Sequence, residues 1–98
     1  MKEISIDTLQ SLMAGGEVPL IDVREVDEYE AGHVPGAVNF PLSQLEQTYA
    51  QLDKGTAYHV ICQMGGRSAK AVAFLEEKGY DVTNVVGGTQ AYPDSLEK

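Results

Sequence analysis

The chain alternates short apolar runs with stretches in which apolar residues recur at helical spacing. An apolar run closed by polar or charged residues is typical of an interior strand in a parallel sheet, because both faces of such a sheet are buried. The predicted strands and extended segments lie at residues 1–4, 19–23, 33–39, 58–61 and 82–86. Because helical stretches separate them, we predict an α/β fold with a mainly parallel sheet and helices on both faces.

Four stretches between these segments are predicted to form helices, and a glycine that can end a helix follows each of them. Their ranges are 6–13, 24–30, 43–54 and 69–75. Ser5 is the expected N-cap of the first helix. Ser43 and Glu46 have the S-x-x-E spacing of a capping box, which predicts that the third helix starts at Ser43. Residues 89–96 hold at most one short helix, because Pro93 interrupts them.

The only cysteine lies where a strand is predicted to end and a helix to begin, in the sequence C-Q-M-G-G-R-S. At such a junction the first amide N–H groups of the helix lack partners, and the peptide dipoles leave positive charge there. Gly65 and Gly66 let these N–H groups turn inward as an anion-binding nest, and Arg67 adds a planar cation that suits oxyanions. A cysteine that only packs needs none of these neighbours. We therefore predict that Cys62 is a nucleophile with a lowered pKa.

Composition limits the remaining possibilities. The 98 residues, 43% of them hydrophobic, predict one globular domain spanning residues 1–98. A formal net charge of −8 with seven scattered basic residues argues against nucleic acid, and no apolar stretch suggests membrane insertion or secretion. The same acidity opposes the approach of a small dianion, a cost that salt screens. One cysteine allows no internal disulfide, so we expect a reducing, cytoplasmic compartment.

Other polar residues are candidates for the edge of the site. In open α/β sheets ligands bind beyond the carboxyl ends of strands, where Asp22 and Arg24 are expected. We interpret these two as an ion pair or turn bond that organises the edge, and His33 as a residue that orients a turn rather than a catalytic base. His59 points to the opposite side of its strand from Cys62. Two histidines and one cysteine at these spacings make a poor zinc set, so no metal is predicted.

Four segments, taken together, carry a resemblance to a known family. They are L-I-D-V-R at 20–24, G-H-V-P-G-A-V-N at 32–39, C-Q-M-G-G-R-S at 62–68 and V-G-G-T-Q-A-Y at 86–92. In this order they resemble the motifs of the rhodanese family, sulfurtransferase domains that carry sulfane sulfur on a cysteine. Tyr92 stands where tryptophan is common. The resemblance covers nearly the whole chain and implies a five-stranded parallel sheet flanked by helices.

The resemblance also implies a reaction in two steps on a catalytic Cys62. Its thiolate attacks the outer sulfur of a donor, thiosulfate or a persulfide, and then passes that sulfur to cyanide or a thiol acceptor. Arg67 would bind the oxyanion end of thiosulfate, while loop amides would hold the persulfide. The implied substrate-binding residues are Gln63, Met64, Gly65, Gly66, Arg67 and Ser68. No metal or organic cofactor is required.

Two alternative functions remain open from the sequence. Cysteine-dependent phosphatases of the C-x5-R type have one more residue between cysteine and arginine than Cys62 and Arg67 have, and their wider cradle fits phosphate; phosphatase or arsenate reductase activity is the enzymatic alternative. A persulfide carrier that exchanges sulfur with a partner protein in a sulfur relay is the other. Met64 would then form an apolar rim for that partner, although filling a gap is an equal interpretation.

Overall fold

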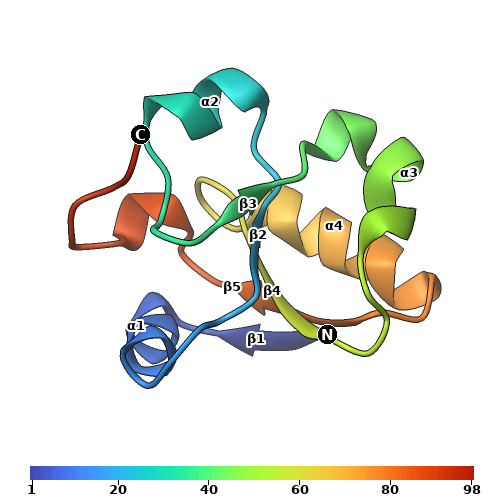
Figure 1. Ribbon diagram of the computed structural model, residues 1–98, viewed down its shortest axis with the longest axis horizontal. Helices are drawn as coiled ribbons and strands as arrows, with labels where there is room; N and C mark the ends of the chain where they lie inside the picture. Colours follow the sequence, from blue (N-terminus) through green and yellow to red (C-terminus); the bar gives the residue numbers. More distant parts are fainter.

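A five-stranded, entirely parallel sheet forms the centre of the computed structural model, which describes all residues 1–98 (Figure 1). The strand order is β1-β5-β4-β2-β3. The strands are β1 (Lys2–Ile4), β2 (Leu20–Asp22), β3 (Val38–Asn39), β4 (Ala57–Ile61) and β5 (Asp81–Val85). This confirms the predicted parallel sheet. It also places β4 between β5 and β2, so the residue that follows β4 lies near the middle of the carboxyl edge.

Helices cover both faces of this sheet, as predicted. They are α1 (Ile6–Ala14), α2 (Val26–Ala31), α3 (Leu45–Thr48) and α4 (Gly66–Glu77). The N-cap prediction for α1 is confirmed, because the Ser5 side chain accepts from the Thr8 amide at 3.1 Å. Helix α4 buries side chains at the i, i+3, i+4 and i+7 positions that a helix needs to cover a sheet. These are Ser68, Ala71, Val72 and Leu75.

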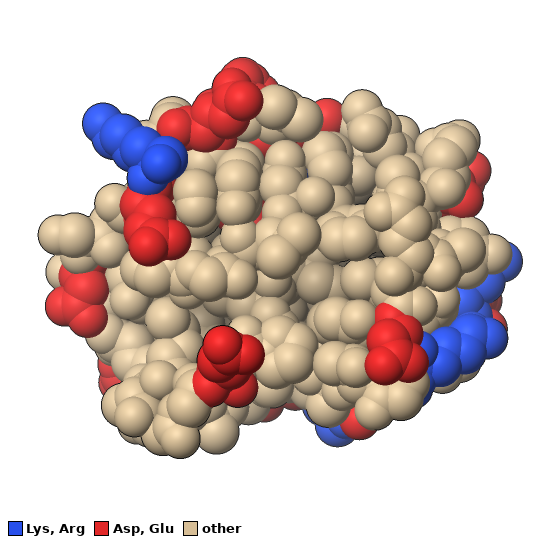
Figure 2. All heavy atoms as spheres, viewed as in Figure 1, with Lys and Arg blue, Asp and Glu red and all other residues tan.

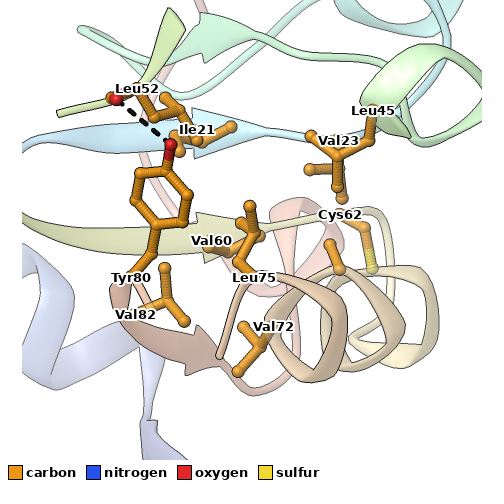
Figure 3. Packing of buried hydrophobic residues seen from close by; sticks show 11 residues of the cluster. Ile21, Val23, Leu45, Leu52, Val60, Cys62, Val72, Leu75, Tyr80 and Val82 are labelled. Carbon is orange, nitrogen blue, oxygen red and sulfur yellow. Dashed lines mark hydrogen bonds between the residues drawn. The ribbon is translucent and has the colours of Figure 1, made fainter. Parts of the chain in front are cut away.

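Two clusters of buried apolar residues lie on opposite faces of the sheet. The larger one, shown in Figure 3, joins strands β2, β4 and β5 to helices α3 and α4. The smaller one packs Ile6 and Leu9 of α1 against residues such as Ile61 and Val85. Neighbouring residues of β4 point to opposite faces, so Val60 and Cys62 enter the first cluster while Ile61 enters the second.

The prediction of a continuous helix from Ser43 to about Lys54 is wrong. A 3-10 turn (Leu42–Gln44), the one-turn helix α3 and a second 3-10 turn (Tyr49–Gln51) occupy this region instead. The capping box does not form, because the Ser43 hydroxyl donates to the carboxylate of Glu25 at 2.6 Å, and the residue at the N-cap of α3 makes no side-chain capping bond. A tertiary contact has replaced a local one.

The acidic helix predicted for residues 24–30 begins two residues later, at Val26. Glu25 is its N-cap, and Glu25 and Glu28 form a reciprocal capping box that the sequence reasoning did not identify. Arg24 lies outside the helix because its side chain turns back to Asp22.

Asp22 and Arg24 form a buried ion pair at the carboxyl end of β2. The Arg24 guanidinium donates to both carboxylate oxygens of Asp22 at 2.9–3.1 Å and to the carbonyl of Gly32 at 2.7 Å. Asp22 is fully buried and Arg24 is 4% exposed. The pair thus fastens the end of β2 to the segment that follows α2, and each charge depends on the other for its solvation.

Charged side chains on the face shown in Figure 2 are dispersed around an uncharged central area. The Lys and Arg side chains there lie in separate places rather than in one continuous stripe. This face therefore offers no basic track of the kind that binds a nucleic-acid backbone. None of the helices combines the length and the apolar composition that crossing a membrane requires.

Replacing Asp22 by Ala should reduce the free energy of unfolding by about 3–5 kcal/mol, because it leaves the Arg24 guanidinium buried without its partner. Chemical denaturation measures the loss. The matched control is Asp81→Ala, which breaks the exposed ion pair between Lys2 and Asp81 and should cost about 1 kcal/mol or less. Similar losses in both variants would contradict the structural role given to the buried pair.

Candidate active site

The predicted nucleophile lies directly after β4, at the centre of the carboxyl edge of the sheet. The chain turns from Cys62 through Gly65 into α4, which begins at Gly66. Gly65 occupies the N-cap position with φ of 116° and ψ of −12°. Residues other than glycine rarely adopt this left-handed backbone conformation. This glycine therefore allows the loop to fold back over the sulfur atom before the helix starts.

The sulfur atom of Cys62 sits inside a ring of hydrogen-bonding groups. The Gly65 amide donates to Sγ at 3.0 Å, and the Ser68 hydroxyl lies 3.3 Å from it. While the thiol is protonated it donates to Ser68 Oγ, and the hydroxyl donates in turn to the Gly65 carbonyl oxygen at 3.1 Å. Once the thiol is ionised, the single hydroxyl proton can turn to Sγ instead. Cys62 is only 1% exposed, so it belongs to the apolar core on one side and to this polar ring on the other.

Two opposing effects set the pKa of Cys62. Burial, the largest single effect, raises the pKa of the thiol, while hydrogen bonds from the Ser68 hydroxyl and from the amides of Ser68, Gly65 and Met64 lower it. The combined hydrogen bonds prevail, and the pKa of Cys62 falls below its ordinary value. A buried thiol surrounded by aliphatic groups alone would shift in the opposite direction. The ring therefore stabilises the thiolate form of Cys62 although the residue is buried.

The segment that follows β5 donates hydrogen bonds to the backbone of the Cys62 loop. Thr89 donates to the Cys62 carbonyl through its amide at 2.8 Å and its hydroxyl at 3.2 Å, and the Gln90 amide donates to the Gln63 carbonyl at 3.1 Å. A Cβ on Gly88 would lie 2.5 Å from both of these carbonyl oxygens. The sequence analysis named Gly88 only within the V-G-G-T-Q-A-Y segment at 86–92, whereas the structure shows that the backbones approach closely at this glycine.

The side chain of Arg67 is paired with a carboxylate of α2. Its two terminal nitrogens donate to the two oxygens of Glu28 at 2.6 and 2.9 Å. Because of this hydrogen-bonded pairing, the pKa of Glu28 falls to about 2, although partial burial acts in the opposite sense. The sequence reasoning did not include Glu28 in the site. Its only sequence signal was its place in the acidic stretch after β2.

The remaining predicted loop and edge residues have distinct surroundings. The Gln63 side chain accepts a long hydrogen bond of 3.4 Å from Arg24. This bond links residues 62–68, the candidate active loop (called the active loop below), to the buried ion pair. Met64 is 66% exposed and Gly66 has open space around it. His33 stacks on Tyr29 with ring centroids 3.8 Å apart, and its Nδ1 lies 2.9 Å from the Tyr29 carbonyl. His33 thus contacts α2 and not the sulfur atom.

A cavity of about 800 Å³ lies elsewhere. It surrounds the segment that leads into β2, at the opposite end of that strand from Asp22, and no residue of the active loop lines it. Its lining includes Met13, Val18, Phe40 and Tyr58 but no cysteine, serine or histidine that could act as a nucleophile or base. No group of three or more His, Cys, Asp or Glu side chains is placed to hold a metal ion. The reactive geometry is thus found at the Cys62 loop.

Comparison with known proteins agrees with the fold. The family model described as "Rhodanese-like domain" matches residues 5–94. The chain therefore belongs to the rhodanese-like domain family. Its fold is shared with a rhodanese-like domain protein from Staphylococcus aureus (TM-score 0.93, 35% identity, 99% of this chain and 97% of that one). A crystal structure of a Staphylococcus saprophyticus protein matches with a TM-score of 0.94 at 31% identity, over the whole of both chains.

Curated relatives carry names from sulfur metabolism. The human thiosulfate:glutathione sulfurtransferase is 35% identical over 109 residues, covering 97% of this chain and 93% of that protein. Bacillus subtilis (strain 168) YtwF, provisionally named a sulfurtransferase, is 38% identical over 93 residues and 90% covered. YrkF of the same organism, provisionally named a sulfur carrier, is 33% identical over 97 residues, and the chain spans only 52% of its length. Relatives of this chain thus include proteins named for both roles.

Replacing Gly88 by Ala should lower the free energy of unfolding by at least about 3 kcal/mol, through both a glycine-only backbone conformation and collision with the loop carbonyls. Its φ and ψ are 65° and −165°. Gly36→Ala is the matched control, since its φ is 87° but nothing lies within 4 Å of the added carbon; it should lose about 1–2 kcal/mol. Equal losses by chemical denaturation would argue against the close approach.

Proposed function

We propose that this protein is a sulfurtransferase that moves sulfane sulfur from thiosulfate or a persulfide to cyanide or a thiol through a persulfide on Cys62. One observation carries the proposal: the Cys62 sulfur accepts a 3.0 Å hydrogen bond from the Gly65 amide within a ring that includes Ser68. That ring favours the negative charge that Sγ bears before attack and that the outer sulfur bears in the persulfide. Membership of the rhodanese-like family supports the same chemistry.

In the first step the Cys62 thiolate attacks the outer sulfur of the donor. A new S–S bond forms, the bond between the two donor sulfurs breaks, and its electron pair leaves with sulfite or, from a persulfide donor, with a thiolate. Since both leaving groups are stable anions, no general acid is needed to protonate them. The loop amides then hold the terminal sulfur of the Cys62 persulfide where the donor sulfur was.

In the second step an acceptor attacks that terminal sulfur. A thiolate acceptor forms a new persulfide and cyanide forms thiocyanate, while the electron pair of the broken S–S bond returns to Cys62. The ring thus stabilises the nucleophile of the first step and the leaving group of the second with the same hydrogen bonds. No residue has to change its protonation state between the steps.

The reaction needs a reduced thiol, so we propose that the protein acts in the reducing environment of the cytoplasm.

A persulfide carrier is the second candidate function. The exposed side chain of Met64, 66% accessible at the tip of the active loop, favours it because an apolar group beside the nucleophile suits contact with a partner protein in a sulfur relay. The similarity to YrkF points the same way. The carrier would accept sulfur from a protein persulfide and turn over small donors slowly, whereas the enzyme would cycle with small donors and acceptors.

Treatment with thiosulfate or glutathione persulfide should add one sulfur atom to the protein, because only one thiol is present. Intact-protein mass spectrometry measures the gain, and cyanide should remove the added sulfur as thiocyanate. The control is Cys62→Ser, which should gain nothing. A wild-type protein that stays unmodified by both donors, or a Cys62→Ser variant that gains the same mass, would refute transfer through Cys62.

A further inference from the structure

The two guanidinium groups beside the Cys62 loop are each paired with a carboxylate. Arg67 is engaged by both oxygens of Glu28, and Arg24 by both oxygens of Asp22. The hydrogen bonds that reach the Cys62 sulfur come from loop amides and the Ser68 hydroxyl, which carry no formal charge. Local dipoles thus stabilise the thiolate of Cys62. Neither guanidinium can bind an incoming anion without first leaving its carboxylate partner.

Thiosulfate would have to compete with Glu28 for Arg67. The oxygen-bearing end of thiosulfate would use the planar fork of Arg67, and the Glu28 carboxylate occupies that fork at 2.6 and 2.9 Å. Glu28 is tethered to α2 and has a high effective concentration. Its Oε1 also accepts from the Glu25 amide at 3.1 Å, which fixes the orientation of the side chain. Its pKa of about 2 keeps it charged at any pH at which the thiol reacts.

We propose that Glu28 is a specificity-determining residue, which withholds Arg67 from dianionic oxyanion donors and so directs the site toward persulfides of thiols. This inference rests on the proposed transfer of sulfur through Cys62. A thiol persulfide presents its transferable sulfur without an oxyanion group beside it, so it needs the amide ring but not the arginine fork. Thiosulfate must displace Glu28 from Arg67 to use the fork, against an acidic chain of net charge −8.

Glu28→Gln tests this inference with little change of shape. The amide oxygen of Gln can still accept from Glu25, so the capping interaction of α2 is retained while the charge is lost. Asp27→Asn is the matched control, because Asp27 is an exposed residue in the first turn of the same helix and makes no contact with Arg67. The double variant Glu28→Gln/Arg67→Ala shows whether any gain depends on the arginine.

The rate of sulfur loading on Cys62 is measured by intact mass over a range of thiosulfate and of glutathione persulfide concentrations. For Glu28→Gln, we expect the half-saturating thiosulfate concentration to fall about three- to tenfold, the range expected for releasing a partly exposed ion pair. The value for glutathione persulfide should change less than about twofold, since it does not need the fork. Asp27→Asn should behave as wild type, and the thiosulfate gain should vanish in the double variant.

Several results would overturn the inference while leaving the proposed function intact. These are an unchanged or higher half-saturating thiosulfate concentration in Glu28→Gln, an equal shift for both donors, an equal gain in Asp27→Asn, or a gain that survives loss of Arg67. Failure of the proposed function looks different, because neither donor would then load Cys62 in the wild type or in any variant. The two failures can therefore be told apart in one set of measurements.

Discussion

The chemistry depends on the contest between burial of the Cys62 sulfur and the hydrogen bonds that converge on it. Cys62 is only 1% exposed, because it follows β4 on the face of the sheet that carries the larger apolar cluster. Such burial favours the protonated form of a thiol. Hydrogen bonds from the Ser68 hydroxyl and from the amides of Ser68, Gly65 and Met64 oppose that effect and lower the pKa of Cys62. Cys62 is thus buried away from solvent and still stabilised as an anion. Both properties suit a persulfide, which is a reactive anion that water and other solutes could otherwise reach.

The ring works only if the loop holds its shape, and residues far away in the sequence hold it. Thr89 fixes the Cys62 carbonyl, while Gly88 lets the two backbones meet without a side chain between them. Arg24 extends the buried ion pair of β2 toward Gln63. Three segments that are separate in the chain therefore meet at the carboxyl edge of the sheet, where an α/β fold builds its sites.

The sequence predicted the parallel sheet and the position of the cysteine because both follow from local signals: buried apolar runs, and a glycine pair between a strand and a helix. It did not predict the Arg67–Glu28 pair, since the two residues are 39 positions apart and meet only through the placement of α2. Ser43 illustrates the same limit. Its spacing to Glu46 fits a capping box, but no capping box forms there, because the Ser43 hydroxyl donates to the Glu25 carboxylate instead. Local patterns are reliable until a tertiary contact offers a better partner.

A titration of the Cys62 thiol tests the central claim most directly. The ultraviolet absorbance of the thiolate is followed against pH in the wild type and in Ser68→Ala, with Cys62→Ser as the blank. Because hydrogen bonds favour the ionised form, the wild-type midpoint should lie below the value of about 8.5 of an ordinary thiol, and loss of the Ser68 hydroxyl should raise it. A wild-type midpoint at or above the ordinary value, or no change on removing Ser68, would contradict the role of the ring.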